Sequence, residues 1–350
     1  MIIVSNLILF PLATFVLGYY IVETVMKREE PIHSIKASWI RWAILTIIVV
    51  TFIPVLTHTF YIVNDFNAPF WSTYQTVLLS YRVGNVWLAV IALGALLIIA
   101  SIRKVHPGFS LALMVVLFFV IGLTSHSAAL SPVAGYMANM LHLLAIAFWI
   151  GTLFVTVFAT KHFPWSWFIS WFSPLAIISV AVLVGSGLFM MRTVTPEYVN
   201  SWVLPYGQLL LLKHLVFIPL LMFGVVHGFF LKKRVEQGKS PKRSFAIESG
   251  IALVILFITS IMIEQVPPHV VEHTIESNDP SSLFLLIKGV VSLPLTLAFQ
   301  PIGLLFGSLA VTTLAYLFVV IRLQKGYWLS VFLTLCFVLF GYIALMGSVN

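Results

Sequence analysis

The chain has 350 residues, of which 61% are hydrophobic and only 9% are charged. A soluble domain carries about 25% charged residues, so these few charges could not cover a soluble surface. The composition therefore predicts a polytopic integral membrane protein. The formal net charge of +8 does not indicate nucleic-acid binding, because most basic residues lie where membrane topology requires them.

The apolar runs are about 20 residues long and do not alternate with period two, which favours helices over a closed barrel. We expect an all-α transmembrane bundle of about ten helices, a core of eight followed by a C-terminal pair. The first helix has no basic leader and no cleavage signal, so it is interpreted as retained in the mature protein. The predicted helices span residues 2–26, 38–62, 75–101, 107–124, 133–160, 166–190, 206–231, 244–265, 300–323 and 327–346.

The basic residues test this helix count. Fifteen of the 19 lie in or beside odd-numbered connections, and Lys27, Arg28, Lys239 and Lys325 are among them. Basic residues accumulate in the cytoplasmic loops of membrane proteins. With an even number of helices, both termini are therefore predicted to lie outside.

The chain divides into four predicted segments. A stretch between the eighth and ninth helices, SLFLLIKGVVSLPLTLAF, is interrupted by Lys288 and Pro294. We expect it to be an interfacial or re-entrant segment on the outer side. The segments are an N-terminal three-helix part (1–106), a helical core (107–268), an outer loop (269–299) and the C-terminal helix pair (300–350).

Four histidines stand out because ionisable groups inside a membrane are costly and mark candidate sites. His142 and His214 lie eight or nine residues into the fifth and seventh predicted helices. At 1.5 Å per residue, both are roughly 13 Å below the outer end. His58 and His126 lie near the outer ends of the second and fourth helices. A histidine at such a depth can also serve only as an interhelical hydrogen-bond partner.

Methionines share the outer position of these histidines. Met137 and Met140 precede His142 on its helix. Thioether is soft and selects Cu(I), and imidazole accepts either oxidation state of copper. The single cysteine, Cys336, excludes an internal disulfide and a multi-cysteine zinc site. The predicted metal ligands are therefore the four histidines with Met137 and Met140, and the predicted metal is copper.

Four further residues are candidates for supporting roles. Trp149 follows His142 by seven residues, so the two are expected to share a helix face. His227 is predicted to lie about 220° around the helix from His214, near the inner end. There it could meet Glu248, in a pair that is either structural or passes a proton. Lys213 is expected to snorkel toward the outer surface or to act as a counter-charge.

The remaining polar residues receive plainer interpretations. His33, His106 and His162 lie in predicted inner loops and are expected to be solvated. Arg82 near the outer end of the third helix is interpreted as an interface anchor beside Trp71.

Four stretches, taken together, resemble the copper resistance protein D (CopD) family of bacterial inner-membrane proteins. The resemblance extends over roughly residues 110–268, without clear similarity in the first hundred residues. The residues that match the family pattern are His126, His142, Trp149, Gly151, Tyr206, Gly207, Lys213 and Glu248. The stretches are SHSAAL (125–130), LHLLAIAFWIGTLF (141–154), YGQLLLLKHLVFIPLLM (206–222) and ESGIALVILFITSIMIEQVPP (248–268). Ser125 and Thr152 stand where glycine is usual in the family.

This resemblance implies copper uptake through a multi-pass protein of the bacterial cytoplasmic membrane. It leaves open whether an extracytoplasmic copper carrier is a partner. Membrane lipid is the other expected partner, and no enzymatic activity is expected. The sequence has no G-x-x-x-x-G-K-[ST] motif, so the driving force is expected to be a gradient or a downstream sink.

Three alternatives remain open. His142 and His214 could ligate a b-type haem in a redox protein. The chain could instead deliver copper to an oxidase as an assembly factor without transporting it. It could also be a membrane scaffold whose histidines are structural.

Overall fold

The computed structural model describes residues 2–25, 32–238, 240–323 and 326–350. Of the basic residues counted above, Lys27, Arg28, Lys239 and Lys325 lie outside these ranges. Within the ranges every regular element is a helix, and β-structure is limited to two isolated bridges, His33 with Ala159 and Leu297 with Val349. This confirms the predicted all-α fold.

Nine helices in the described part of the chain are long and apolar enough to cross a membrane. They span Ile2–Val25, Ala37–Phe66, Arg82–Ile102, Ala134–Thr156, Trp165–Val194, Pro205–Lys232, Lys242–Met262, Pro301–Leu323 and Tyr327–Gly347. A shorter apolar helix, Pro107–Gly122, falls at the predicted fourth helix. Each of the ten predicted helices thus coincides with a helix of the structure. The ends that the charge distribution assigns to the outside are called predicted outer ends below.

The chain forms two compact units, which are described separately. The first comprises Met1–Phe163 and Ile178–Met190, and the second comprises Pro164–Ile177 and Met191–Asn350. Helix α10 (Trp165–Val194) contributes to both. This division cuts the chain differently from the four predicted segments.

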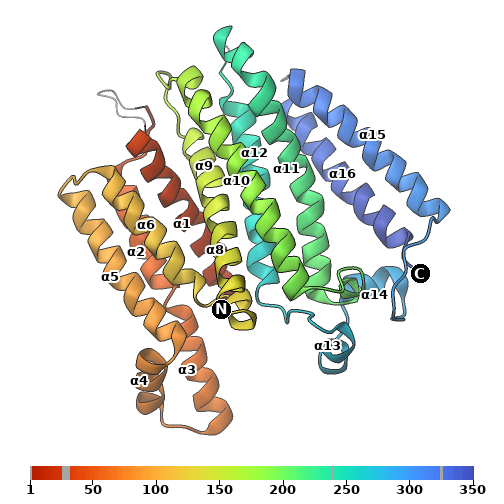
Figure 1. Cartoon of the computed structure of the whole chain (residues 1–350), viewed down its shortest axis with the longest axis horizontal. Helices are drawn as coiled ribbons and strands as arrows, with labels where there is room; N and C mark the ends of the chain where they lie inside the picture. Colours follow the sequence, from red (N-terminus) through yellow and green to blue (C-terminus); the bar gives the residue numbers. More distant parts are fainter. Residues whose placement is uncertain (1, 26–31, 239, 324–325) are drawn as a thin grey trace. The chain divides into compact units, whose positions relative to one another are not determined.

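In the first unit, α1 (Ile2–Val25) packs against α2 (Ala37–Val50), α6 (Pro107–Gly122) and a π-helical turn. Such turns hydrogen-bond from i to i+5 and often occur at functional sites. The turn, η1 (Ala147–Gly151), connects α8 (Ala134–Ile146) to α9 (Thr152–Thr156). Helix α5 (Arg82–Ile102) lies beside α6 in the same unit (Figure 1).

Close backbone contact joins α1 to the π turn. A Cβ atom on Gly18 would lie 1.9 Å from the carbonyl carbon of Gly151. A Cβ atom on Gly151 would in turn lie 2.2 Å from the carbonyl oxygen of Thr14. Both glycines are therefore required for this helix packing.

Three predicted helices are interrupted. The second divides into α2 and α3 (Ile53–Phe66), and Pro54 lies in the first turn of α3, where its missing N–H is tolerated. The third divides at Tyr81, whose backbone is extended, into α4 (Phe70–Ser80) and α5. The fifth contains the π turn and ends at Thr156 instead of residue 160.

The second unit is built around α11 (Pro205–Glu236) and α12 (Lys242–Met262), which pack against each other. The hairpin of α15 (Pro301–Leu323) and α16 (Tyr327–Gly347) packs on α11. Tyr342 donates a hydrogen bond of 2.6 Å to the Gln208 side-chain oxygen. The predicted C-terminal pair is thus joined to its unit by a buried polar contact as well as by apolar packing.

Short helices complete the loops at the predicted outer ends. In the first unit, α7 (His126–Leu130) precedes α8. In the second unit, η2 (Asn200–Val203) precedes α11, while α13 (Val271–Ser277) and α14 (Ser282–Lys288) follow α12. With seven residues each, α13 and α14 are too short to span a bilayer. Apolar residues of η2, α11, α13, α14 and α16 share one buried cluster.

Candidate functional site

His142 is half-buried in α8, and its ring is held by α10. Its Nδ1 lies 3.2 Å from the hydroxyl oxygen of Ser186. That hydroxyl donates its single proton to the Val182 carbonyl at 2.6 Å. The oxygen of Ser186 must therefore accept from Nδ1–H, which assigns the tautomer of His142. The lone pair of the ring is on Nε2, which is the form that binds metals.

Gly187 gives the His142 ring its space. A Cβ atom at residue 187 would lie 3.3 Å from Cε1 and 3.6 Å from Nδ1 of His142. Helix α10 therefore orients this imidazole with two adjacent small residues, one through a hydrogen bond and one through close packing.

Two other histidines donate Nδ1–H to a backbone carbonyl. His58 on α3 has its Nδ1 2.8 Å from the Pro54 oxygen. His269, before α13, has its Nδ1 3.1 Å from the Thr193 oxygen. A carbonyl oxygen can only accept, so both rings also carry their lone pair on Nε2.

The remaining predicted ligands of the first unit differ in exposure. His126 is exposed at the start of α7, which Ser125 caps through its hydroxyl. Met137 is 43% exposed, whereas Met140 is fully buried. The Met140 methyl occupies the space above Gly122 of α6, since a Cβ there would lie 1.6 Å from it. Met140 therefore also packs α8 against α6.

His214 lies on α11 in the second unit, beside Tyr198. The Tyr198 hydroxyl and His214 Nδ1 are 2.8 Å apart. Burial raises the pKa of Tyr198 from 10.0 to about 12, so its hydroxyl stays protonated at physiological pH. Lys213 is half-buried and close enough to His214 to interact with it electrostatically. In the part of the chain that the structure describes, no acidic side chain pairs with Lys213.

His227 and Glu248 meet as the sequence predicts. Nδ1 of His227 lies 2.5 Å from a Glu248 carboxylate oxygen, and its Nε2 lies 2.6 Å from the Ser244 hydroxyl. All three side chains are buried, with exposed fractions of 5%, 1% and 3% in that order. Ser244 was not among the predicted residues. Its four-residue spacing from Glu248, which places both on one face of α12, is the signal that could have found it.

Trp149 lies within the π turn and is 1% exposed. Its indole N–H has no hydrogen-bond partner among the described residues. A π turn changes the angular spacing of side chains, so the shared face predicted for Trp149 and His142 assumed an α-helix that does not continue.

One loop histidine differs from its predicted surroundings. His33 is 8% exposed instead of solvated, and its Nε2 lies 2.9 Å from a Glu23 carboxylate oxygen. The reason is that its segment bridges to Ala159 and is covered by the chain. His106 and His162 are exposed as predicted.

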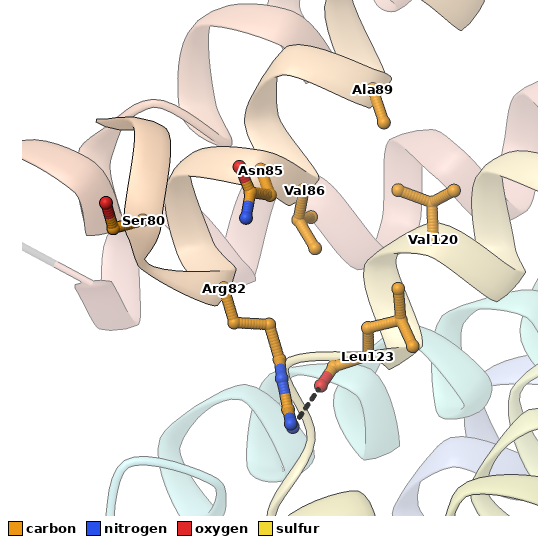
Figure 2. A pocket seen from close by; sticks show the side chains of 7 residues that line it. All are labelled: Ser80, Arg82, Asn85, Val86, Ala89, Val120 and Leu123. Atoms are coloured by element: carbon orange, nitrogen blue, oxygen red, sulfur yellow. Dashed lines mark hydrogen bonds between the residues drawn. The ribbon is translucent and has the colours of Figure 1, made fainter. Parts of the chain in front are cut away.

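A pocket of about 410 Å³ opens where α4, α5 and α6 come together (Figure 2). Arg82 reaches across it and donates a hydrogen bond of 3.2 Å to the Leu123 carbonyl. Ser80 and Asn85 are the other polar residues that line it. Trp71 of α4 is 73% exposed, which fits the interface-anchor interpretation of this region.

The described residues contain no group of three or more His, Cys, Asp or Glu side chains placed to hold a metal ion. At His58, His142, His214 and His269 the contacts are instead pairs, in which a serine, a tyrosine or a carbonyl oxygen orients one imidazole. Sequence reasoning did not identify Ser186, Tyr198 or Thr193 as these partners. They come from other elements than the histidines, and nothing in the local sequence specifies the pairing.

Comparisons with known proteins identify related sequences. Residues 167–262 match the family model described as copper resistance protein D. The chain is 27% identical over 200 residues to the copper transport protein CutJ of Bacillus subtilis (strain 168). That alignment covers 51% of this chain and 36% of the relative, so the chain spans about a third of the relative's length. No solved structure matches.

The matched segment contains His214, His227, Ser244 and Glu248, whereas His126 and His142 precede it. The resemblance predicted from four sequence stretches is therefore confirmed most directly in its second half. The two comparisons show that part of this chain is similar to the copper resistance protein D family and to a copper transport protein, and its described residues form many helices long and apolar enough to span a membrane.

Proposed function

We propose that this chain transports copper ions inward across the bacterial cytoplasmic membrane. The family match and the copper transport protein among its relatives support this function. The direction of transport and the residues that carry the ion are our inference from the sequence and the site geometry.

The observation that carries the proposal is the orientation of His142 by Ser186. A histidine that binds a metal usually donates its other ring N–H to a fixed oxygen, which sets the tautomer. Ser186 provides this oxygen from a neighbouring helix. His142 itself lies eight residues into α8, about 12 Å below the predicted outer end of that helix at 1.5 Å per residue. Imidazole nitrogen and methionine sulfur are ligands suited to copper.

Transport requires sites that bind weakly enough to release the ion. Conduction is efficient when an ion passes between several modest sites instead of one closed cage. His58, His126 and Met137 would receive copper from outside. Deeper in the membrane, His142 and Met140 would bind it in the first unit, and His214 would bind it separately in the second unit. Copper would arrive free or on an extracytoplasmic carrier protein, and a gradient or an inner sink would drive uptake.

Copper content and absorption spectrum of the purified chain test this proposal, with copper accumulation measured in cells. We expect His142→Ala and His214→Ala each to lower copper binding at least tenfold. His162→Ala is the matched control, since it removes an exposed loop imidazole. Unchanged copper content in both site variants would contradict the proposed site. A haem absorption spectrum in the wild type that both variants lose would show that these histidines bind haem instead of copper. Normal binding without accumulation would favour copper delivery over transport.

A further inference from the structure

Three buried polar side chains form a continuous hydrogen-bonded chain in the second unit. Glu248 contacts Nδ1 of His227, and Nε2 of His227 contacts Ser244, at 2.5 Å and 2.6 Å. Because backbone and side-chain polar groups are costly to bury without partners, all three are expected to be held in this arrangement. Both ring nitrogens of His227 are engaged, so the ring bridges an acid and a hydroxyl.

The surroundings of this chain are apolar. The rings of Phe245 and Phe223 lie 4.7 Å and 5.9 Å from the His227 ring, measured between centroids. Helix α16 and residues 165–177 of α10 contain no charged residue. The guanidinium groups of Arg243 and Arg322 lie over other aromatic rings, those of Tyr327 and Phe230. Lys232 on α11 is exposed. Among the described residues, His227 is the ion-pair partner of Glu248.

The site has two protonation states that differ in charge. In the first state, His227 and Glu248 share one proton. The pair is then either an imidazolium with a carboxylate or a neutral imidazole with a carboxylic acid, and it has no net charge. When that proton leaves, Ser244 donates to Nε2, Nδ1–H still donates to Glu248, and one negative charge remains. An uncompensated buried charge costs several kcal/mol. Loss of the proton is therefore favourable only when another cation replaces it.

The chain also has a direction. Ser244 is two residues and Glu248 six residues after Lys242, the first residue of α12. At 1.5 Å per residue, these positions are roughly 3 Å and 9 Å along the axis. The hydrogen bonds thus lead from the buried carboxylate through the imidazole toward the predicted inner end of α12. Ser244, which follows the exposed Arg243, is the member of the chain nearest that end, so a released proton would leave through it.

We infer that Glu248, His227 and Ser244 form a proton-binding site whose proton is exchanged for copper during transport. The inference rests on the proposed copper transport. His214 and His227 lie on the same helix, thirteen residues apart, with Pro219 between them. A copper ion that reaches the inner half of α11 compensates the carboxylate. The N–H or O–H bond of the pair then breaks, and the proton passes through Ser244 to water. No electron is transferred, and copper keeps its oxidation state.

The test uses the full chain in liposomes that report internal and external pH. The probe is Cu(I), kept reduced by ascorbate. We expect about one proton to move against each Cu(I) accumulated. Glu248→Gln keeps the size and polarity of the side chain but cannot take up the charge, so it should lower the proton-to-copper ratio at least tenfold. Ser244→Ala should slow proton movement severalfold, because it removes the last member of the relay.

Two controls match these variants. Ser249→Ala removes a buried hydroxyl that has no hydrogen-bond partner among the described residues, next to Glu248. Glu23→Gln neutralises the acid of another His–Glu pair, in which the glutamate side chain is 35% exposed. Both should retain the wild-type ratio.

An independent readout needs no transport. In detergent, Cu(I) binding should release a proton from the pair. If that proton is on Glu248, the infrared carboxylic-acid band that Glu248→Gln abolishes should decrease. If it is on His227, a pH-sensitive dye should detect its release. Copper accumulation without proton movement, or an unchanged ratio in Glu248→Gln, would overturn the exchange. Wild-type liposomes that accumulate no more copper than empty ones would overturn the proposed transport itself. A wild-type chain that binds Cu(I) and releases no proton would overturn the exchange even if the variants fail to fold.

Discussion

Ser186 on α10 accepts a hydrogen bond from His142 on α8, because the serine proton is already donated to the Val182 carbonyl. This relay from imidazole to hydroxyl to carbonyl gives the ring one tautomer. It links a helix that carries a candidate ligand to a helix of small residues. The orientation of His142 is thus a property of two helices together.

Removing this oxygen is expected to weaken copper binding. Loss of a partner that orients a metal-binding histidine typically costs 10- to 100-fold in affinity, so we expect about tenfold for Ser186→Ala. Ser186→Thr keeps a hydroxyl and should retain most of the affinity. Cu(I) competition titration of the purified protein measures both.

Ser179→Ala is the control, because it removes another buried serine of α10, seven residues earlier on the same helix face. Equal affinities for Ser186→Ala and Ser179→Ala would show that the hydroxyl does not prepare His142 for metal.

Lys213 is expected to oppose copper binding at His214. The two residues are adjacent and interact electrostatically, and a cation bound to the imidazole would be repelled by the ammonium group. Two unit charges about 8 Å apart repel by about 2 kcal/mol at an effective dielectric constant of about 20. Lys213→Met should therefore tighten copper binding about thirtyfold and slow its release. Stopped-flow dissociation of Cu(I) into a chelator measures the release rate.

A weaker affinity in Lys213→Met would instead indicate that the ammonium group supports the site, for example by binding an anion. Lys232→Met is the control, since Lys232 is an exposed lysine on the same helix. It should leave both the affinity and the dissociation rate unchanged.

The spanning helices were predictable because a membrane imposes a strong and local rule. About 20 consecutive apolar residues suffice to identify a span, and each predicted helix coincides with a helix of the structure. The breaks at Tyr81 and in the π turn were not predicted. Gly84 packs against the carbonyl groups of Val77 and Leu78 across the first break, and Gly151 packs against the backbone of Thr14 in α1. Hydropathy contains neither contact.

Some polar contacts were also predictable from the sequence, and others were not. The His227–Glu248 pair was predictable because both residues are ionisable and lie at equal depth in consecutive helices, where few other partners exist. The burial of His33 was predicted wrongly, because the fold brings residue 159 over a loop that sequence alone leaves open. Ser186 and Tyr198 are common residue types, and only the tertiary arrangement distinguishes them from their neighbours.

Tyr198 is expected to make the free energy of unfolding decrease at alkaline pH. Burial raises its pKa from 10.0 to about 12, so the folded protein holds the phenolic proton more tightly than the unfolded chain. Its contribution is fully present below pH 10 and is lost as the pH rises through about 12. Tyr198→Phe has no proton to lose and should show a smaller decrease in stability over this range.

Thermal unfolding at a series of pH values measures the difference between wild type and Tyr198→Phe. The same variant should also bind copper more weakly, because His214 loses its hydrogen-bond partner. Parallel pH profiles for the two proteins would contradict the assignment of Tyr198 as a buried, protonated phenol.

Gly18 and Gly185 offer a paired test of the packing of the first unit. A Cβ atom on Gly18 would lie 1.9 Å from the Gly151 carbonyl carbon and 2.0 Å from its oxygen, whereas none of the described atoms lies within 4 Å of a Cβ on Gly185. The obstacle at Gly18 is backbone, which cannot rotate away as a side chain can. Overpacking of this kind costs about 1–3 kcal/mol and occasionally more, so we expect Gly18→Ala to destabilise by about 3 kcal/mol.

Gly185→Ala should instead be neutral or stabilise slightly, because alanine has the higher helix propensity. Loss of helical circular dichroism on heating in detergent measures the unfolding of each variant. The π turn that Gly18 contacts follows directly after the helix carrying His142. Displacement of that turn should therefore also lower copper binding in any Gly18→Ala protein that remains folded. Similar melting temperatures for the two alanine variants would mean that α1 and the π turn do not pack as closely as the structure has them.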